Sequence, residues 1–195
     1  LRCIFRDQNL IFNEIASLKI ITIPSTKKVI EKFQFSEFTG MEKVIIPDSI
    51  TSIGQGSFSK CFSLKEIIIP KFVVSIGKNA FEHCSSLKKI VIPPSVISIG
   101  SGAFSNCTSL KKIVIPSSIV SISEYVFSGC SSLRKISIPS SITSIGDKCF
   151  SRCLSLETVI FEKKSKLESI GSSCFYDCKS LKEIEIPSSI TLIKN

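Results

Sequence analysis

The chain repeats itself with a period of 23 residues, and this period constrains its fold more than any other feature. Phenylalanines recur at that interval and reach Phe175 after a two-residue expansion: Phe35, Phe58, Phe81, Phe104, Phe127 and Phe150. Prolines keep the same interval from Pro24 to Pro139, and cysteines keep it from Cys61 to Cys153. A fixed period of this length is typical of solenoids, in which each repeat packs mainly against its neighbours. We therefore expect about eight stacked coils of 23 residues.

Residues 77–99 form the clearest single repeat. Their apolar positions at Ala80, Phe81, Cys84 and Leu87 have the spacing i, i+1, i+4 and i+7. This spacing places them on one face of a short helix of about two turns. Gly77 recurs as Gly54, Gly100, Gly146 and Gly171, with Ser123 as the exception. A column of glycines predicts a turn that needs a positive φ.

The second part of each repeat alternates in the manner of a β-strand. In residues 88–93, Ile90 and Ile92 are expected to point inward while Lys89 and Val91 point outward. Equivalent strands are predicted at residues 43–46, 66–69, 89–92, 112–115, 135–138, 158–161 and 183–186. Stacking then creates a parallel sheet on one side of the solenoid, with short helices or turns on the other.

The repeats are not equally regular along the chain. Residues 1–34 form a degenerate N-terminal region, in which Phe12, Leu18 and Ile21 still keep register, whereas residues 35–195 follow the pattern closely. The two extra residues lie in a charged stretch around residues 161–166. The chain begins without a leader-like sequence and stops in the middle of a coil, so we expect a fragment of a longer protein.

The motif that recurs is Gly-x-x-Ala-Phe-x-x-Cys-x-Ser-Leu-x-x-Ile-x-Ile-Pro, as in residues 77–93. It closely resembles the repeat of the BspA-like leucine-rich-repeat family. The resemblance implies an α/β leucine-rich-repeat solenoid and a non-enzymatic, adhesion-type binding module at the cell surface or secreted. It brings no catalytic residue and no defined binding residue with it. An intracellular scaffold or docking solenoid, located in the cytoplasm, is the alternative.

The cysteine column is expected to consist of buried free thiols, because cysteine packs as a small apolar side chain. Coil spacing alone would permit disulfides, but side chains that point in parallel along a column suit packing better than bridging. Cys149 and Cys153, followed one coil later by Cys174 and Cys178, could in principle bind zinc. Cys149 and Cys174 occupy the position of Ala80, however, so we interpret them as packing residues and expect no metal site.

No residue pattern indicates catalysis. Serines recur in several columns, but a serine nucleophile needs an adjacent base, and the only histidine is His83. The position of His83 varies from repeat to repeat, which indicates a solvent-facing site. We therefore predict no enzyme activity, no catalytic residue and no cofactor.

Outward-facing cations form the first functional candidate. The formal charge is +9, and two adjacent columns carry six cations over three coils: Lys88, Lys89, Lys111, Lys112, Arg134 and Lys135. They are interpreted either as a solubilising fringe or as a surface for an anionic partner, such as a sulfated glycan, a mucin or an acidic protein. Nucleic acid is a less favoured partner, because the columns contain no aromatic residue on which bases could stack.

The outward strand centres form the second candidate. Four consecutive coils place an aliphatic residue there: Ile45, Ile68, Val91 and Val114. Contiguous exposed apolar surface often marks an interaction site, although β-branched residues also favour strands for local reasons. The favoured hypothesis is protein or glycan recognition on the sheet face. Oligomeric state and the identity of the partner do not follow from the sequence.

Overall fold

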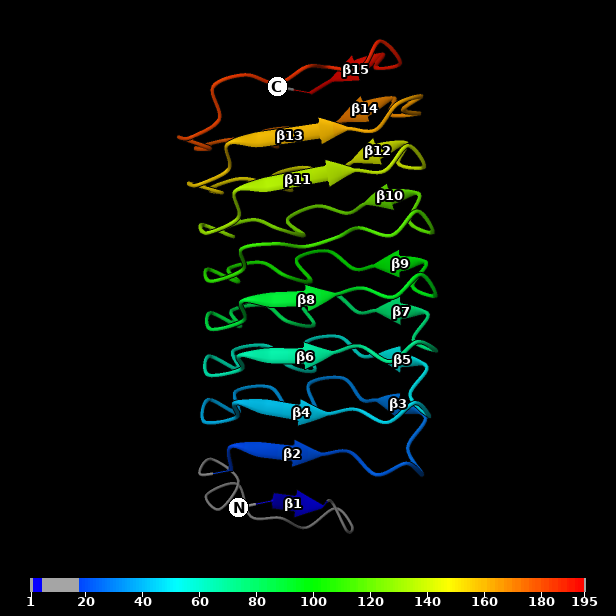
Figure 1. Cartoon of the computed structure of the whole chain (residues 1–195), viewed down its shortest axis with the longest axis vertical. Coiled ribbons are helices and arrows are strands. Elements are labelled where there is room, and N and C mark those ends of the chain that lie inside the picture. The colour runs from blue at the N-terminus through cyan, green and yellow to red at the C-terminus, as the bar shows by residue number, and fades with distance from the viewer. Residues whose placement is uncertain (1, 5–17, 195) are drawn as a thin grey trace.

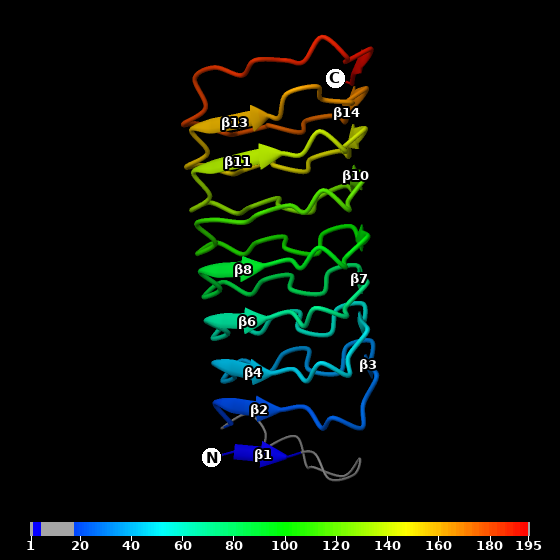
Figure 2. The ribbon, with the colours of Figure 1, turned by 45° about the vertical axis from the view of Figure 1, so that its right-hand side comes forward.

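The computed structural model describes residues 2–4 and 18–194, which form one elongated stack of coils (Figure 1). Phe12 and much of the degenerate N-terminal region lie outside the described residues. The two ends of the chain lie at opposite ends of the stack, and each coil contacts the coils before and after it (Figures 1 and 2). The predicted solenoid with one coil per 23 residues is therefore confirmed.

The first row of strands, which we call the front sheet, consists of short parallel strands, with at most one strand from each coil. Its first segment has the order β1-β2-β4-β6-β8 and its second contains β11-β13. Residues one repeat apart are paired, as in Ile67 with Ile90 and Ser137 with Ile160. The bounds are β1 (Arg2–Ile4), β2 (Ile20–Thr22), β4 (Lys43–Ile45), β6 (Glu66–Ile68), β8 (Lys89–Val91), β11 (Lys135–Ile138) and β13 (Thr158–Phe161).

A second row of two-residue strands, which we call the side sheet, lies after the proline of each coil or, for β14, after the charged insertion. From the sequence, this segment was expected only to return the chain to the core. Its strands are also parallel, in the orders β3-β5-β7-β9 and β10-β12-β14-β15. The bounds are β3 (Val29–Ile30), β5 (Ser52–Ile53), β7 (Ser75–Ile76), β9 (Ser98–Ile99), β10 (Ser121–Ile122), β12 (Ser144–Ile145), β14 (Ser169–Ile170) and β15 (Leu192–Ile193).

The predicted short helices are wrong, because the described residues contain no helix. The third side of each coil is a run of turns, which we call the turn row. The amide of Phe81 donates to the Ala103 carbonyl of the next coil at 2.8 Å, whereas the amide of Cys84 donates to the Phe81 carbonyl at 3.1 Å. Half of the amides thus bind the neighbouring coil and are lost to the i→i−4 pattern that a helix requires. The apolar face was still identified correctly, since Ala80, Phe81, Cys84 and Leu87 are all fully buried.

The interpretation of the glycine column is also wrong in its physical reason. Positive φ values occur in two other columns, represented by Asn79 at 54° and His83 at 58°. Gly100 does not have a positive φ, but a Cβ there would come within 2.4 Å of the Lys78 nitrogen. The glycines are therefore needed because the backbones of consecutive coils approach closely.

The core is a continuous column of stacked side chains. The phenylalanine rings of consecutive coils lie nearly parallel, with centroids 5.3 Å apart for Phe58 and Phe81 and 5.8 Å apart for Phe104 and Phe127. The thiol of Cys84 donates to the carbonyl oxygen of Phe58 at 3.2 Å, and the same bond recurs along the column. The eight cysteines from Cys61 to Cys178 are free, and all except Cys178 are buried, which confirms the prediction of unbridged thiols in the column.

Both sheets are interrupted in the coil formed by residues 100–122. The predicted strand at 112–115 is wrong, since only Lys112 joins the ladder, as a bridge to Lys89. In the side sheet, β9 is not paired with β10. Ser123 stands where five other coils have glycine, and its Cβ opposes the usual close approach. Within the described residues its amide makes no bond to Ile99, and its hydroxyl donates to the Ile99 carbonyl at 3.0 Å instead.

The predicted strand at 183–186 is wrong as well. β13 pairs with β11 on one side, but residues 183–186 form no strand along its other side. The charged insertion around residues 161–166 directly follows β13, and a groove separates β13 from residues 183–187. Carboxylates at Glu157, Glu162, Glu183 and Glu185 line this groove and oppose its closure by charge repulsion.

Candidate functional site

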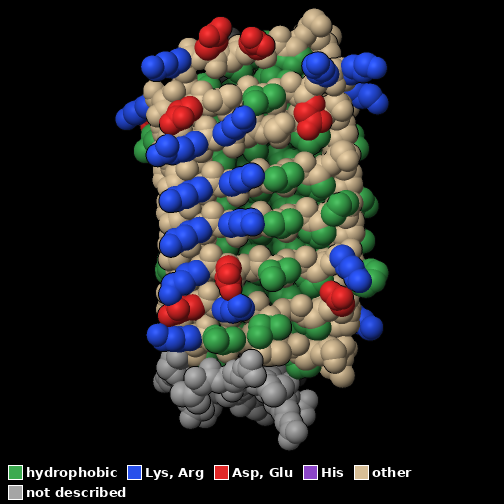
Figure 3. Space-filling view, in the orientation of Figure 1, with side chains coloured by type: hydrophobic (Ala, Val, Ile, Leu, Met, Phe, Trp, Pro, Cys, Tyr) green, Lys and Arg blue, Asp and Glu red, His purple; other side chains and the backbone are tan. Residues whose placement is uncertain are grey.

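The six cations predicted from the sequence lie together on the front sheet, and we call them the basic patch. All six side chains are exposed: Lys88, Lys89, Lys111, Lys112, Arg134 and Lys135. They form paired rows at the edge of the sheet over the middle coils, with apolar side chains beside them (Figure 3). Strand β8 positions Lys89 because Ile90 points inward and is almost fully buried.

Charge pairing separates the basic patch from the coils before it. In the first coils the same columns contain carboxylates, so Lys43 pairs with Glu66 at 2.7 Å and Lys65 pairs with Glu42 at 2.6 Å. Hydrogen bonds from Lys65 and Lys19 lower the pKa of Glu42, and a hydrogen bond from Lys43 lowers the pKa of Glu66. None of the six patch cations forms an ion pair within the described part of the chain. Their charge is therefore available to a partner.

A shallow groove of about 500 Å³ connects the paired coils with the patch. It is lined by Lys19, Ile20, Glu42, Lys43, Lys65, Glu66, Lys88 and Lys89. Its N-terminal end is neutralised by the ion pairs, whereas Lys88 and Lys89 at its other end are unpaired. The charge along the groove thus increases in the direction of the patch.

The predicted aliphatic column on the front sheet is exposed, and we call it the apolar stripe. Ile45 is 38% exposed, Ile68 is 79%, Val91 is 56% and Val114 is 57%. Side chains of this kind normally lose water when a partner covers them, which favours association. The structure thus brings the basic patch and the apolar stripe onto one continuous face.

The side sheet carries a second exposed aliphatic set that was not predicted from the sequence. Val74, Ile97 and Val120 follow one another in consecutive coils and are 45%, 65% and 56% exposed. They occupy the coils that also carry Ile68, Val91 and Val114. A second apolar column with a 23-residue spacing was the available signal, but it was hidden because this segment was not recognised as a strand.

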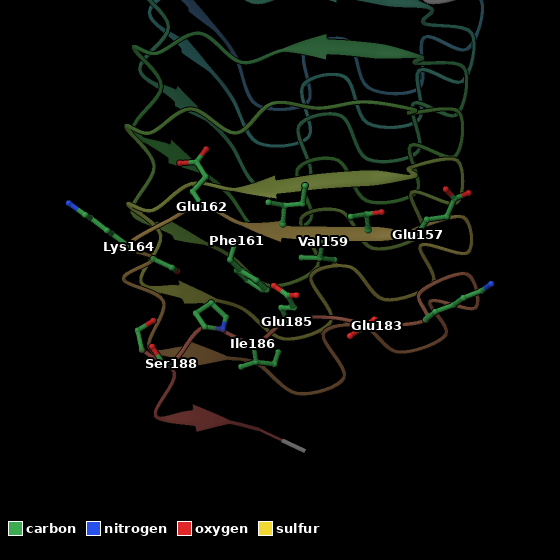
Figure 4. Close-up of a pocket in the computed structure, with 15 residues that line it drawn as sticks. Glu157, Val159, Phe161, Glu162, Lys164, Glu183, Glu185, Ile186 and Ser188 are labelled. Carbon is green, nitrogen blue, oxygen red and sulfur yellow. The ribbon is translucent and has the colours of Figure 1, made fainter.

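A larger groove lies elsewhere, between β13 and residues 183–187, with a volume of about 650 Å³ (Figure 4). Glu157, Glu162, Glu183 and Glu185 line it together with Lys164 and Lys182. Four carboxylates against two amines make it unsuitable for an anionic partner. The groove with the greater volume and the surface with unpaired positive charge are therefore different parts of the molecule. An anionic partner is complementary in charge to the basic patch and not to this groove.

The column cysteines are the residues to consider for catalysis or metal binding. Burial raises the pKa of the column thiols, to about 12 for Cys61 and about 11 for the half-buried Cys178. Nucleophilic cysteines react as thiolates, so a raised pKa disfavours that role for these thiols. The described residues contain no cluster of three or more potential metal ligands. In the same part of the chain, no helix is long and apolar enough to traverse a lipid bilayer.

Comparison with known proteins agrees with this architecture. The model of the BspA type leucine rich repeat region matches residues 8–124 and 97–195, with six copies of the repeat. No curated protein matches the sequence.

Solved structures share the fold. A leucine-rich repeat protein from Bacteroides ovatus is 37% identical, with a TM-score of 0.84, over 90% of this chain and 45% of its own. A leucine-rich repeat protein from T. pallidum is 31% identical, with a TM-score of 0.66, over 72% of this chain and 66% of its own. A leucine rich cell surface protein from Faecalibacterium prausnitzii is 28% identical, with a TM-score of 0.62, over 89% and 60%.

The chain spans less than two thirds of the Bacteroides and Faecalibacterium proteins. Solenoids of this class generally serve as scaffolds for binding, through the extended surfaces that stacked repeats create. On the match of its repeats and the structure of its coils, this chain belongs to the BspA-type leucine-rich repeat family.

Proposed function

We propose that the front sheet is a binding surface for an anionic protein or glycan, and that the chain is a non-enzymatic recognition module of the adhesion type. The observation that carries this proposal is the unpaired charge of the basic patch. Neighbouring coils neutralise the same columns with Glu42 and Glu66. A purely solubilising fringe would not require six cations without carboxylate partners over three consecutive coils.

The two parts of the surface have different roles in this proposal. The cations accelerate encounter with an anionic partner through long-range attraction. The apolar stripe retains the partner after contact, because burial of Ile68, Val91 and Val114 removes apolar surface from water. Both parts occupy one face, so a single partner can contact them together.

The binding test uses immobilised heparin as a sulfated glycan and polyglutamate as an acidic polypeptide. The triple variant Lys89→Glu, Lys112→Glu and Lys135→Glu should lose at least about tenfold in affinity and most of the salt dependence. The matched control is Lys163→Glu, Lys164→Glu and Lys166→Glu, which makes the same change in net charge on the charged insertion. Circular dichroism checks that both variants fold.

Selective loss in the first variant supports the proposal. Equal loss in the two variants would mean that net charge alone controls binding. Failure of the native chain to bind either probe would remove the anionic partner from the proposal.

We also propose that the module acts at the cell surface. The Faecalibacterium protein, which is similar over most of this chain, is described as a cell surface protein. Antibody labelling of intact and permeabilised source cells provides the test. Labelling of intact cells is expected, and labelling only after permeabilisation would favour an intracellular scaffold instead.

A further inference from the structure

The turn row carries a second, smaller pocket that shares no residue with the basic patch or the apolar stripe. It has a volume of about 260 Å³. Three successive coils supply its lining, which consists of Tyr125, Ser128, Lys148, Ser151, Arg152 and Tyr176. Two aromatic rings, two cations and two hydroxyls thus converge on one hollow.

The backbone holds these residues in fixed positions. The amide of Tyr125 donates to the Asp147 carbonyl at 2.9 Å, and the amide of Lys148 donates to the Ser172 carbonyl at 2.9 Å. The amide of Arg152 donates to the carbonyl of Tyr176 at 2.7 Å. Coil-to-coil hydrogen bonds therefore join the pocket's three coils and fix the backbone positions from which these side chains project.

Three of the lining residues occupy backbone positions that favour glycine. The φ values are 57° for Tyr125, 52° for Lys148 and 59° for Arg152. The preceding coils have Gly102 and Gly129 in these two columns, with φ values of 64° and 72°. Bulky side chains in this conformation carry a free-energy cost that glycine avoids. The same two columns hold side chains with a positive φ in other coils as well, such as Phe33, Lys60 and His83, so this conformation is common to the turn row.

The polar groups of the pocket are free to meet a ligand. Within the described residues, the side chains of Ser128, Ser151 and Arg152 form no hydrogen bond or ion pair. The Nζ of Lys148 lies 5.7 Å from the centre of the Tyr125 ring, which favours a position at the rim of the pocket.

Within the described residues, no carboxylate forms an ion pair with Lys148 or Arg152. Glu124 accepts a hydrogen bond from the hydroxyl of Ser101 at 3.1 Å, and Asp147 accepts one from the amide of Ser172 at 2.8 Å. Asp177 pairs with Lys179 at 3.6 Å. The unpaired positive charge is thus concentrated on Lys148 and Arg152.

We propose that this pocket binds a single sugar unit that carries a carboxylate. The planar guanidinium of Arg152 matches a carboxylate through two parallel hydrogen bonds, and Lys148 adds a second charge. Tyr176 is 60% exposed and offers an open ring against which the apolar edge of a sugar packs. The hydroxyls of Ser128 and Ser151 exchange hydrogen bonds with sugar hydroxyls. The volume suits one sugar ring rather than a long chain.

The test is calorimetric titration of the whole chain with sialyllactose, lactose and sulfated lactose. Sialyllactose should bind at least about tenfold more tightly than lactose, because only the former offers a carboxylate to Arg152. Sulfated lactose distinguishes recognition of a carboxylate from attraction of any anion, and it should bind more weakly than sialyllactose. Arg152→Ala should weaken the binding of sialyllactose at least about tenfold.

Lys148→Gly separates binding from folding. It should weaken the binding of sialyllactose while leaving the Tm unchanged or higher, because glycine relieves the positive φ. Lys164→Gly is the matched control: Lys164 also has a positive φ, of 59°, but lies outside the pocket. Its affinity for sialyllactose should equal that of the native chain.

Equal binding of lactose, equal binding of sulfated lactose, no binding of sialyllactose at millimolar concentration, or equal losses in Lys148→Gly and Lys164→Gly would each overturn the proposal. Loss of heparin binding on the front sheet would not affect it, because the two surfaces are separate.

Discussion

The thiol of Cys107 donates a hydrogen bond of 3.2 Å to the carbonyl oxygen of Phe81 in the preceding coil. The same bond joins Cys130 to Phe104 and Cys153 to Phe127. Cysteine therefore does two things in this column: it fills a small apolar position, and it adds a donor from the next coil to a buried carbonyl. Alanine would fill part of the same space but would remove this link between coils, leaving the Phe81 oxygen with the amide of Cys84 as its donor.

This arrangement predicts that the chain loses stability in alkali. Burial raises the pKa of Cys107 well above its ordinary range, with the thiol of Cys84 as a second cause. The unfolded chain releases this proton near pH 9, whereas the folded chain retains it. The contribution is therefore fully present below pH ~9 and is lost as the pH rises towards the folded pKa. Each buried thiol should remove about 1.4 kcal/mol of unfolding free energy per pH unit.

Urea titrations between pH 8 and pH 11 measure this slope. Cys107→Ala should reduce the slope by the equivalent of one proton, although it lowers stability at pH 8. An unchanged slope in this variant would show that the thiol does not control the alkaline transition.

Phe104→Ala should lower the unfolding free energy by about 3–5 kcal/mol, because the ring is fully buried and stacks on both neighbouring rings. Chemical denaturation provides the measurement. Phe62→Ala is the control, since Phe62 is 42% exposed and lies outside the stack. A loss below about 1 kcal/mol for Phe104→Ala would contradict a core role.

The glycine column predicts opposite effects at two equivalent positions. A Cβ at Gly100 would meet the Lys78 nitrogen at 2.4 Å, so Gly100→Ala should lower stability by about 2–4 kcal/mol. Ser123→Gly should allow the amide at that position to reach the Ile99 carbonyl and should raise stability by about 1 kcal/mol. Thermal unfolding of both variants gives the comparison. A stabilising Gly100→Ala would show that close approach does not select glycine.

Binding kinetics should separate the two parts of the front-sheet surface. The variant Val91→Ser with Val114→Ser should dissociate from heparin at least about fivefold faster, with little change in association rate, because apolar contact acts after encounter. Val74→Ser with Val120→Ser is the matched control on the side sheet. Equal acceleration of dissociation in both variants would place the apolar contribution outside the stripe.

The sequence predicted the register of this fold well but not all of its backbone. Because a 23-residue period aligns equivalent positions, the buried places of Phe81, Cys84 and Ile90 followed directly, and so did the exposure of Lys89 and Val91. The helix was wrong because the spacing of Ala80, Phe81, Cys84 and Leu87 fits a row of turns equally well. Periodicity reports which side chains are buried, but it does not report whether an amide bonds within its coil or to the next.

The small pocket on the turn row was hidden for a related reason. Its residues lie in columns that vary from coil to coil, such as the one shared by His83 and Arg152, and such variety was interpreted only as solvent exposure. Both residues have a positive φ, and nothing in their residue types predicts this backbone conformation. The charges of the basic patch, by contrast, were visible because they repeat.

The interruption at Ser123 also has a mechanical consequence. On the turn row the adjacent coils remain joined there, by bonds such as that from the amide of Phe104 to the Val126 carbonyl at 3.0 Å. On the side sheet β9 and β10 are not paired. A force applied along the stack is therefore carried by hydrogen bonds between these coils on the turn row, whereas no strand pairing carries it between β9 and β10. We therefore expect the solenoid to bend more easily at the level of Ser123 than within the coils β3-β5-β7-β9, with the turn row as the side that stays joined.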